Sequence, residues 1–186
     1  MKIHLGGCVA GLKSNPSLYK KIRKVIIDLG HQITRDWIID ELKGVHLSQE
    51  KMYELTFAAI KKSDLVILEA SEDTAGLGQQ LLMALENKTP ILILENEKKN
   101  KSIVGDFVSR EQKKYILKKN YKSSNLKMEI SSFITSMEGK AKYARFNLVL
   151  EKNLDNYLRD KAKKNKTSKT EEIKRLILED KNKVEI

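Results

Sequence analysis

Residues 64–81 read DLVILEASEDTAGLGQQL and decide the fold of the chain. The run 64–69 is short and apolar, which is typical of a strand buried on both faces. The polar, glycine-containing stretch 71–78 predicts a loop, and 79–87 has the pattern of a helix. A buried strand followed closely by a helix is the repeating unit of a parallel α/β sheet.

The same alternation extends in both directions from this stretch. The sequence predicts strands over 2–5, 31–37, 64–69, 89–94 and, at an exposed lysine-rich edge, 113–119. It predicts helices over 17–29, 50–62, 79–87 and 126–137. We therefore expect a Rossmann-like parallel sheet, an α/β domain over residues 1–138, with ligands bound beyond the carboxyl ends of the strands.

Composition limits the classes of protein to consider. The chain has 186 residues, of which 40% are hydrophobic and 33% charged, enough for one ordinary domain or two small ones. Its apolar runs are far shorter than the ~20 residues of a membrane helix, and no secretory leader is expected. Cys8 is the one cysteine, and His4, His31 and His46 lack metal-ligand spacing. We therefore expect a cytoplasmic protein with no membrane partner, no metal and no cofactor.

The basic charge lies in the second half of the chain. The formal net charge is +11, from 36 Lys and Arg against 25 Asp and Glu. Residues 1–97 hold 12 basic and 13 acidic side chains, whereas 98–138 hold 10 and 4, and 139–186 hold 14 and 8. Such concentrated basicity favours a polyanion partner, most often nucleic acid. The alternative is a lysine-rich surface with no partner.

Two glycine-rich segments follow predicted strands and are candidate ligand loops. The first contains Gly7 and Gly11, and the second contains Gly76 and Gly78. Glycines let the backbone approach a ligand closely, and the start of the helix behind the second segment favours a phosphate or carboxylate. A tight strand-to-helix turn without a ligand is the alternative explanation of the second segment.

Residues 1 to about 120 resemble the nucleoside 2-deoxyribosyltransferase family, including its branch of nucleoside 5′-monophosphate N-glycosidases. The matching pieces are GGCVAG after the first strand, Tyr19 with LGH at 29–31, SDLVILEAS, TAGLGQQLLMAL and KTPILIL. The resemblance implies a nucleotide or nucleoside ligand. It also implies that Thr74 contacts a 5′-phosphate, beside Asp73 and the loop glycines.

The chain departs from this family at the residues that carry its chemistry. Gln80 stands where the family has its nucleophilic glutamate, and Thr56 where it has an aspartate. Ala10 stands where the glycosidase branch has an arginine. A neutral amide cannot form a glycosyl-enzyme, so we expect Gln80 to contact a ligand rather than to catalyse. The alternatives are a purely structural remnant and an enzyme that uses Glu69, Glu72 or Asp73.

The C-terminal 48 residues, 139–186, form a second predicted domain. Residues 141–150 alternate like a strand, and 152–164 have a helical pattern. Ser168 with Glu171 is a capping box that starts a second helix. One strand and two short helices cannot bury a core alone, so two copies are expected to pair as a homodimer or a higher even oligomer.

This segment resembles the ribbon-helix-helix proteins of the Arc and MetJ repressor family. The resemblance places Arg145, Asn147 and Val149 on base edges in the major groove of double-stranded DNA. It places the start of the second helix on a phosphate, with these residues in contact: Lys166, Ser168 and Lys169. A tail used only for dimerisation or for a protein partner is the alternative.

The main functional prediction is therefore a dimeric, sequence-specific DNA-binding transcription regulator, whose catalytically disarmed first domain senses a nucleotide or nucleoside or assists oligomerisation. The first alternative is a nucleoside or nucleotide N-glycosidase, or a deoxyribosyltransferase, with a relocated carboxylate. The second alternative is an antitoxin-like partner protein.

Overall fold

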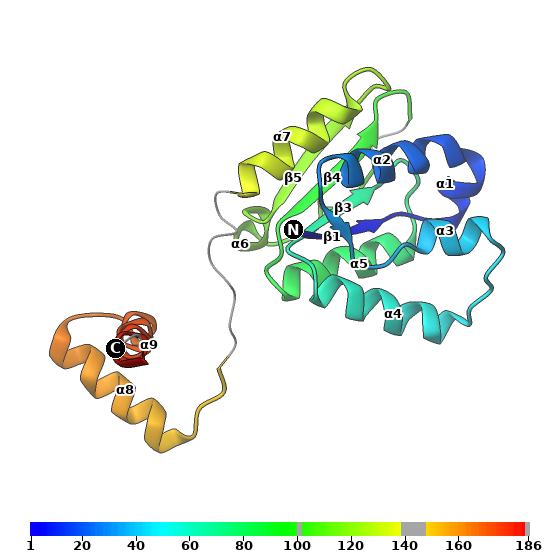
Figure 1. Ribbon diagram of the computed structural model, residues 1–186. Helices are drawn as coiled ribbons and strands as arrows, with labels where there is room; N and C mark the ends of the chain where they lie inside the picture. The colour runs from blue at the N-terminus through cyan, green and yellow to red at the C-terminus, as the bar shows by residue number, and fades with distance from the viewer. Residues whose placement is uncertain (100–101, 139–147, 185–186) are drawn as a thin grey trace. The chain divides into compact units, whose positions relative to one another are not determined.

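The computed structural model describes residues 1–99, 102–138 and 148–184. The chain forms two compact units, residues 1–143 and 144–186 (Figure 1). The predicted domain boundary between 138 and 139 adjoins residues outside the described ranges and stays a prediction.

The first unit is built on a five-stranded sheet of order β2-β1-β3-β4-β5, with every neighbouring pair parallel. The strands are β1 (Lys2–Gly6), β2 (Gln32–Ile33), β3 (Leu65–Glu69), β4 (Ile91–Asn96) and β5 (Ile116–Tyr121). The helices are α1 (Val9–Ser14), α2 (Pro16–Asp28), α3 (Trp37–Leu42), α4 (Gln49–Lys61), α5 (Ala75–Glu86), α6 (Arg110–Lys113) and α7 (Leu126–Glu138). The predicted Rossmann-like parallel sheet is confirmed.

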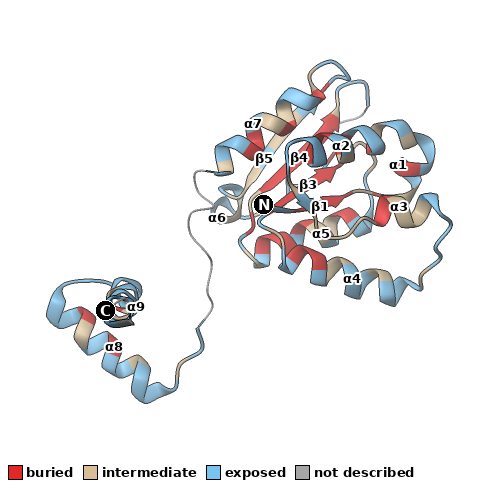
Figure 2. Ribbon diagram, viewed as in Figure 1, coloured by how far each residue is buried: buried red, intermediate tan, exposed pale blue. Residues whose placement is uncertain are grey.

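Helices cover both faces of this sheet and make three layers (Figure 1). On one face, side chains such as Leu5 and Ile67 pack against α2 and α7. On the other face, side chains such as Leu68 and Ile93 pack with α5, against which α4 lies. The central strands are buried on both sides, as the red strands of Figure 2 show. This explains why their sequences are continuously apolar rather than alternating.

Local sequence signals set where the helices begin and end. The side chain of Asn15 caps α2, whose first residue is a proline. Ser48 caps α4 by accepting from the Lys51 N–H at 3.2 Å. Gly30 follows α2 with a φ of +80°, a backbone conformation that glycine adopts without strain.

The prediction of a strand over 31–37 is mostly wrong. Only Gln32 and Ile33 pair with β1, and α3 begins at Trp37. The indole of Trp37 turns into the core, where its Nε1 donates to the Leu5 carbonyl at 2.7 Å. Burying this large ring stabilises the fold more than two further hydrogen bonds between strands at the sheet edge would.

The loop expected over 71–78 is also shorter than predicted. Helix α5 begins at Ala75 rather than at residue 79, because Thr74 caps it by accepting from the Leu77 N–H at 3.3 Å. Gly76 and Gly78 therefore lie in the first turn of the helix. The short helices α1, α3 and α6 were not predicted, since four to six residues are too few to display a helical period.

The second unit contains α8 (Lys152–Asn165) and α9 (Lys169–Val184), which pack against each other. Both helices were predicted. The strand predicted over 141–150 lies outside the described residues up to 147, and residues 148–150 form no strand. The predicted ribbon-helix-helix fold is therefore not shown.

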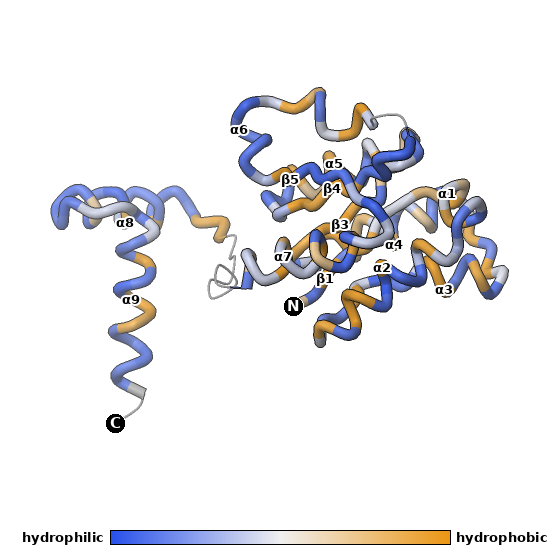
Figure 3. Tube along the Cα trace, turned by 90° about the horizontal axis from the view of Figure 1, so that it is seen from above, coloured by the Kyte–Doolittle hydropathy of each residue, from blue (hydrophilic) through white to orange (hydrophobic). Residues whose placement is uncertain are grey.

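The two units differ in their apolar content. Hydrophobic segments of the first unit lie both in its strands and in helices such as α2 and α3, whereas α8 and α9 are mostly hydrophilic (Figure 3). Leu158 and Ala162 are buried in the second unit, while Leu154, Tyr157 and Ile177 stay about half exposed. Among the described residues, no helix has the length and hydropathy needed to cross a membrane.

Candidate functional site

The order of the sheet locates a crevice at the carboxyl ends of β1 and β3. The chain passes from β1 to β2 on one side and from β3 to β4 on the other, so the loops after β1 and β3 diverge. Ligands of open parallel sheets bind at such a switch point. The loop Gly6–Cys8 and the loop 70–74 both lie here, and α5 begins directly behind the second loop.

Glu69, the last residue of β3, is a buried carboxylate at this crevice. The Tyr19 hydroxyl donates to its Oε2 at 3.0 Å, and the Tyr121 hydroxyl donates to its Oε1 at 3.0 Å. The backbone N–H of Ser71 donates to Oε1 at 3.3 Å, and the Ser71 hydroxyl donates to the same oxygen. Four donors thus fix the carboxylate, three of them on Oε1.

The two tyrosines are arranged to remain donors. Burial raises the pKa of Tyr19 and of Tyr121 well above the usual range, and the negative charge of Glu69 raises each pKa further. Their hydroxyls therefore keep their protons at any physiological pH. A carboxylate held by neutral hydroxyls in a low-dielectric setting is a fixed anion that can stabilise a developing positive charge.

Gln80 lies on the other face of the sheet, beside His4. Gln80 Oε1 is 3.2 Å from His4 Nε2, and Gln80 Nε2 donates to the Gly7 carbonyl at 3.3 Å. Burial lowers the pKa of His4 to about 4, against the opposing effect of the Gln80 hydrogen bond, so the ring is neutral near pH 7. Since an amide oxygen only accepts, His4 Nε2 is assigned the proton. His4 Nδ1 has no hydrogen-bond partner among the described residues.

Thr56 and Arg35 extend this second cluster. Arg35 follows β2, and its Nη1 donates to Thr56 Oγ1 in α4 at 2.9 Å and to the Met52 carbonyl at 3.4 Å. Burial lowers the pKa of Arg35, which nevertheless stays charged. The charge of Arg35 in turn lowers the pKa of His4. Positions 56 and 80, where the resemblance leads one to expect two acids, thus hold neutral side chains that contact Arg35 and His4.

Gly6 and Gly7 form a narrow ridge between the Glu69 side and the Gln80 side. A Cβ at Gly6 would collide with the Gln80 side chain, and a Cβ at Gly7 would lie 2.5 Å from the buried Tyr19 ring. Tyr19 also accepts from the Cys8 N–H at 3.4 Å. Glycine is needed at both positions for close packing, since even the Cβ of an alanine would displace Tyr19 or Gln80.

The structure brings together most of the predicted ligand residues. Gly7 and Gly11 lie against the Tyr19 hydroxyl, and Gln80 contacts Gly7. Gly76 and Gly78 have open space beside their Cα atoms, apart from the Thr74 Oγ1 at 4.0 Å from a Cβ built on Gly76. A ligand can therefore approach the first turn of α5.

Asp73 and Thr74 are engaged within the protein. The carboxylate of Asp73 accepts from the Ser102 hydroxyl and from the Ile103 N–H at 3.3 Å, which ties the loop after β3 to the loop after β4. Thr74 caps α5, as described above. Glu72 is paired with Lys99 at the surface. Of the three acids considered as relocated carboxylates, only Glu69 is buried at the switch point.

Two surface hollows lie away from this crevice. One, of about 360 Å³, is lined by Glu95, Asp106, Lys118 and Asn120 at the end of β4 and β5. Its charges are already matched, because Lys118 Nζ lies 3.1 Å from Glu95 and 3.0 Å from Asp106. The other is at the amino ends of the strands, around Met1 and Asp64. We place the site at the switch point, where the convergent polar groups are. Within the described ranges, no three His, Cys, Asp or Glu side chains converge as a metal site.

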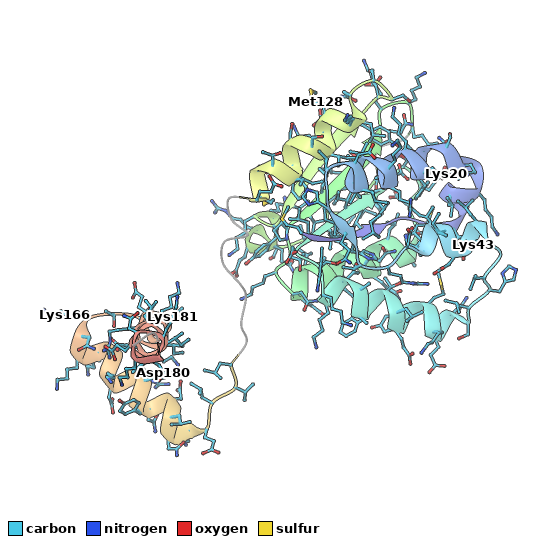
Figure 4. The ribbon with its side chains drawn as sticks, in the orientation of Figure 1. Lys20, Lys43, Met128, Lys166, Asp180 and Lys181 are labelled. Carbon is cyan, nitrogen blue, oxygen red and sulfur yellow. The ribbon has the colours of Figure 1, made fainter. Side chains whose placement is uncertain are left out.

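The predicted DNA contacts are partly outside the described residues. Arg145 and Asn147 lie there, and Val149 is 96% exposed. Lys166 ends α8 in the left-handed conformation, with a φ of 54° (Figure 4). Ser168 forms the predicted capping box with Glu171, and Lys169 pairs with Asp155.

Sequence reasoning missed four residues of the site: His4, Arg35, Ser71 and Tyr121. Each contacts a residue far along the chain, and only Ser71 lies in one of the matching pieces quoted above, SDLVILEAS. The available signals were weak ones, a histidine inside an apolar strand and a serine two residues after a buried glutamate.

Comparisons with known proteins bear on the fold of the chain and on the class of its relatives. No family model matches the chain. It is 25% identical over 140 residues, or 73% of its length, to a Nematostella vectensis protein provisionally named 2′-deoxynucleoside 5′-phosphate N-hydrolase 1, covering 95% of that protein. A Methanococcoides burtonii protein with the same provisional name is 24% identical over 105 residues, which is 55% of this chain and 86% of that one.

A solved structure extends the likeness to three dimensions. The Clostridium botulinum CMP N-glycosidase BcmB superposes with a TM-score of 0.52 at 13% identity, over 71% of this chain and 99% of that one. The fold is nucleoside 2-deoxyribosyltransferase-like. This nucleoside 2-deoxyribosyltransferase-like fold was the one expected for the first domain.

The main functional prediction is wrong. The relatives are named as nucleotide N-hydrolases and the similar structure is a CMP N-glycosidase, so the findings point to the enzymatic alternative and not to a DNA-binding transcription regulator. The error has a physical origin, since lysine-rich charge is not specific for nucleic acid, and part of it is paired with acids within the protein, as at Lys118 and Lys169. The predicted partners (double-stranded DNA, a nucleotide or nucleoside, and a second copy of the chain) stay predictions.

Proposed function

We propose that the first unit binds a nucleoside 5′-monophosphate at the carboxyl ends of β1 and β3 and hydrolyses its N-glycosidic bond, with Glu69 as the catalytic carboxylate. One observation carries this proposal: a buried carboxylate stands at the switch point, held by Tyr19 and Tyr121. The names of the relatives support the reaction class and the substrate class.

The reaction needs an anion next to the sugar. In the hydrolysis, the bond between C1′ and the base nitrogen breaks, water adds to C1′, and the base leaves with a proton. The sugar passes through an oxocarbenium-like cation, which a carboxylate stabilises. Among the described residues, Glu69 Oε2 accepts from Tyr19 alone, whereas Oε1 accepts three hydrogen bonds. Oε2 therefore has the free lone pair that would face C1′.

Glycines shape both loops of the site. A Cβ at Gly7 or Gly11 would collide with Tyr19, so glycine at these positions lets the first loop pack directly against the tyrosine that holds Glu69. The first turn of α5, with open space beside Gly76 and Gly78, presents the positive end of the helix dipole to an anionic ligand. Transfer of the sugar to a second base instead of water is the other reaction of this class.

Base release from nucleotides tests the proposal. The full chain is incubated with the four deoxynucleoside 5′-monophosphates and with CMP, and free base is measured by chromatography. We expect release from at least one of them, at least 100-fold slower in Glu69→Gln, because loss of the anion removes charge stabilisation in the transition state. Glu72→Gln, in the same loop but exposed, is the matched control and should keep full activity.

The outcomes are decisive if folding is monitored alongside. Trp37 fluorescence reports whether Glu69→Gln is folded, since this buried tryptophan is the one in the chain. Binding of every nucleotide without release of base, or equal rates for wild type and folded Glu69→Gln, overturns the assignment. Addition of a second free base to the assay separates hydrolysis from sugar transfer.

For the second unit we propose pairing with a second copy in a ribbon-helix-helix arrangement. The support is a helix pair that buries little of its own apolar surface and leaves these side chains half exposed: Leu148, Leu154, Tyr157, Ile177 and Leu178. Sedimentation equilibrium should give a dimer or higher even oligomer, and Ile177→Lys should dissociate it, whereas the exposed control Asn156→Lys should not. A cytoplasmic location, expected from the single cysteine, belongs to this proposal too.

A further inference from the structure

Arg35 is a half-buried cation whose hydrogen bonds go to neutral acceptors. Its guanidinium donates to Thr56 Oγ1 at 2.9 Å, to the Met52 carbonyl at 3.4 Å and to the Met52 thioether at 3.3 Å. No carboxylate oxygen of the described residues lies within 4.0 Å of it, although Asp40 and Glu41 act on it from farther away. A guanidinium has five N–H donors in a planar fork, so part of its capacity is unused.

Apart from Asp40 and Glu41, which act on it from farther away, Arg35 is surrounded by uncharged residues. His4 is neutral, since burial lowers its pKa to about 4, and Gln80 and Thr56 are uncharged. His4 Nδ1 is also buried without a hydrogen-bond partner among the described residues. The cluster stands at positions 56 and 80, where the resemblance places two acids. Its charge is therefore inverted relative to that expectation.

This inversion decides what the cluster can bind. A positive cluster repels an oxocarbenium-like sugar, so it cannot serve the reacting carbon. It attracts an anion, and the planar fork of an arginine matches the two oxygens of a phosphate. The first glycine loop carries Ala10 where the resemblance places an arginine, so no cation is present at that position.

We propose that Arg35 binds the phosphate group of the nucleotide, on the Gln80 side of the glycine ridge, opposite Glu69. The ligand class, a nucleoside 5′-monophosphate, rests on the proposed function. The phosphate-binding role itself rests on the unpaired, half-buried guanidinium. The phosphate then lies on one side of Gly6 and Gly7, and the sugar carbon faces the carboxylate on the other.

Three probes of the full chain test this role: dCMP, deoxycytidine and inorganic phosphate. Isothermal titration calorimetry compares wild type with Arg35→Gln, Arg35→Lys and the exposed control Arg110→Gln of α6. Loss of a charge-assisted hydrogen bond corresponds to about 1.5–3 kcal/mol, so we expect Arg35→Gln to weaken dCMP binding about 10- to 100-fold. Deoxycytidine binding should be unchanged, and Arg35→Lys should be intermediate because it keeps the charge but not the fork.

A second readout keeps this inference separate from the proposed reaction. Inorganic phosphate should shift the Nε–H resonance of Arg35 in a ¹⁵N spectrum of wild type. If phosphate binding depends on Arg35 but no nucleotide releases its base, the phosphate-binding role of Arg35 is supported and the proposed hydrolysis is refuted. If base is released and the KM for dCMP is the same in Arg35→Lys and wild type, the phosphate-binding role of Arg35 is refuted, while the proposed hydrolysis stands. If Arg35→Gln weakens the binding of dCMP and of deoxycytidine equally, the phosphate-binding role is also refuted, because a purely structural role of Arg35 would affect both ligands.

Discussion

Replacing Tyr19 with phenylalanine tests whether Glu69 is held as a buried anion. The substitution removes the hydroxyl that donates to Glu69 Oε2 at 3.0 Å and keeps the buried ring. A hydrogen bond to a charged group contributes ~1.5–3 kcal/mol. Since Tyr121 and Ser71 still donate to the other oxygen, we expect the free energy of unfolding to fall by about 2 kcal/mol.

Trp37 provides the assay for this unit alone. It is the one tryptophan of the chain, is 6% exposed, and meets the Tyr19 ring edge-on with centroids 5.8 Å apart. Its fluorescence during urea unfolding reports the first unit. With a slope of about 2 kcal/mol per molar urea, the loss corresponds to a midpoint lower by about 1 M. Tyr53→Phe, on an exposed tyrosine of α4, is the control and should leave the midpoint unchanged.

A double-mutant cycle with Glu69→Gln completes the test. If the Tyr19 hydroxyl acts on the carboxylate, Tyr19→Phe should lower the free energy of unfolding by about 1 kcal/mol less in the Glu69→Gln background than in wild type. The reason is that a neutral acceptor forms the weaker hydrogen bond. An identical loss in both backgrounds, or no loss in wild type, would refute the argument that this hydroxyl stabilises a buried anion.

Three further predictions concern the two sides of the glycine ridge. Gly7→Ala should lower the free energy of unfolding by about 1–3 kcal/mol in the urea assay, because its Cβ would lie 2.5 Å from the Tyr19 ring. The ring protons of His4 should not titrate between pH 5.5 and 8 in an NMR titration, because the pKa of His4 in the folded chain is about 4. The free energy of unfolding should fall as the pH drops from about 6.5 to 4, because in this range only the unfolded chain takes up the proton. Gln80→Glu should raise the pKa of His4 and place an acid near Arg35, so the same NMR titration should detect the shift while chromatography finds no gain in base release.

The sequence indicated the sheet well because buried parallel strands are apolar on both faces. The runs 64–69 and 89–94 match β3 and β4 within two residues. Short elements were missed for the opposite reason, since α1 and α3 are too short to show a period. The strand predicted over 31–37 failed because one side chain, Trp37, has a tertiary partner that no local pattern reveals.

The site was only half visible in the sequence. Motifs located Gln80 and the glycines, and Glu69 was one of three candidate acids. What separates Glu69 from Glu72 and Asp73 is burial and the convergence of donors, and one of these donors comes from Tyr121, 52 residues away. Contacts over such separations depend on the order of the strands, which a single sequence does not specify.

The predicted strand of the tail illustrates another limit. A two-stranded ribbon is a property of two chains, so its hydrogen bonds exist only when a second copy supplies the partner strand. By contrast, Ser168 and Glu171 satisfy each other within one turn, and the capping box predicted from their spacing is confirmed. Local polar pairs are predictable from spacing alone, whereas paired strands are not.

Thr56 and Gln80, at positions where the resemblance leads one to expect acids, are best understood together with Arg35. Had Gln80 alone replaced a glutamate, the cluster would be neutral and its role open. With Arg35 hydrogen-bonded to Thr56, the cluster holds a cation, which would oppose the positive charge of a reacting sugar. The proposed hydrolysis therefore requires that chemistry at C1′ take place beyond the glycine ridge, beside Glu69. If catalysis were instead found on the Gln80 side, the reaction would need a group that this cluster does not contain.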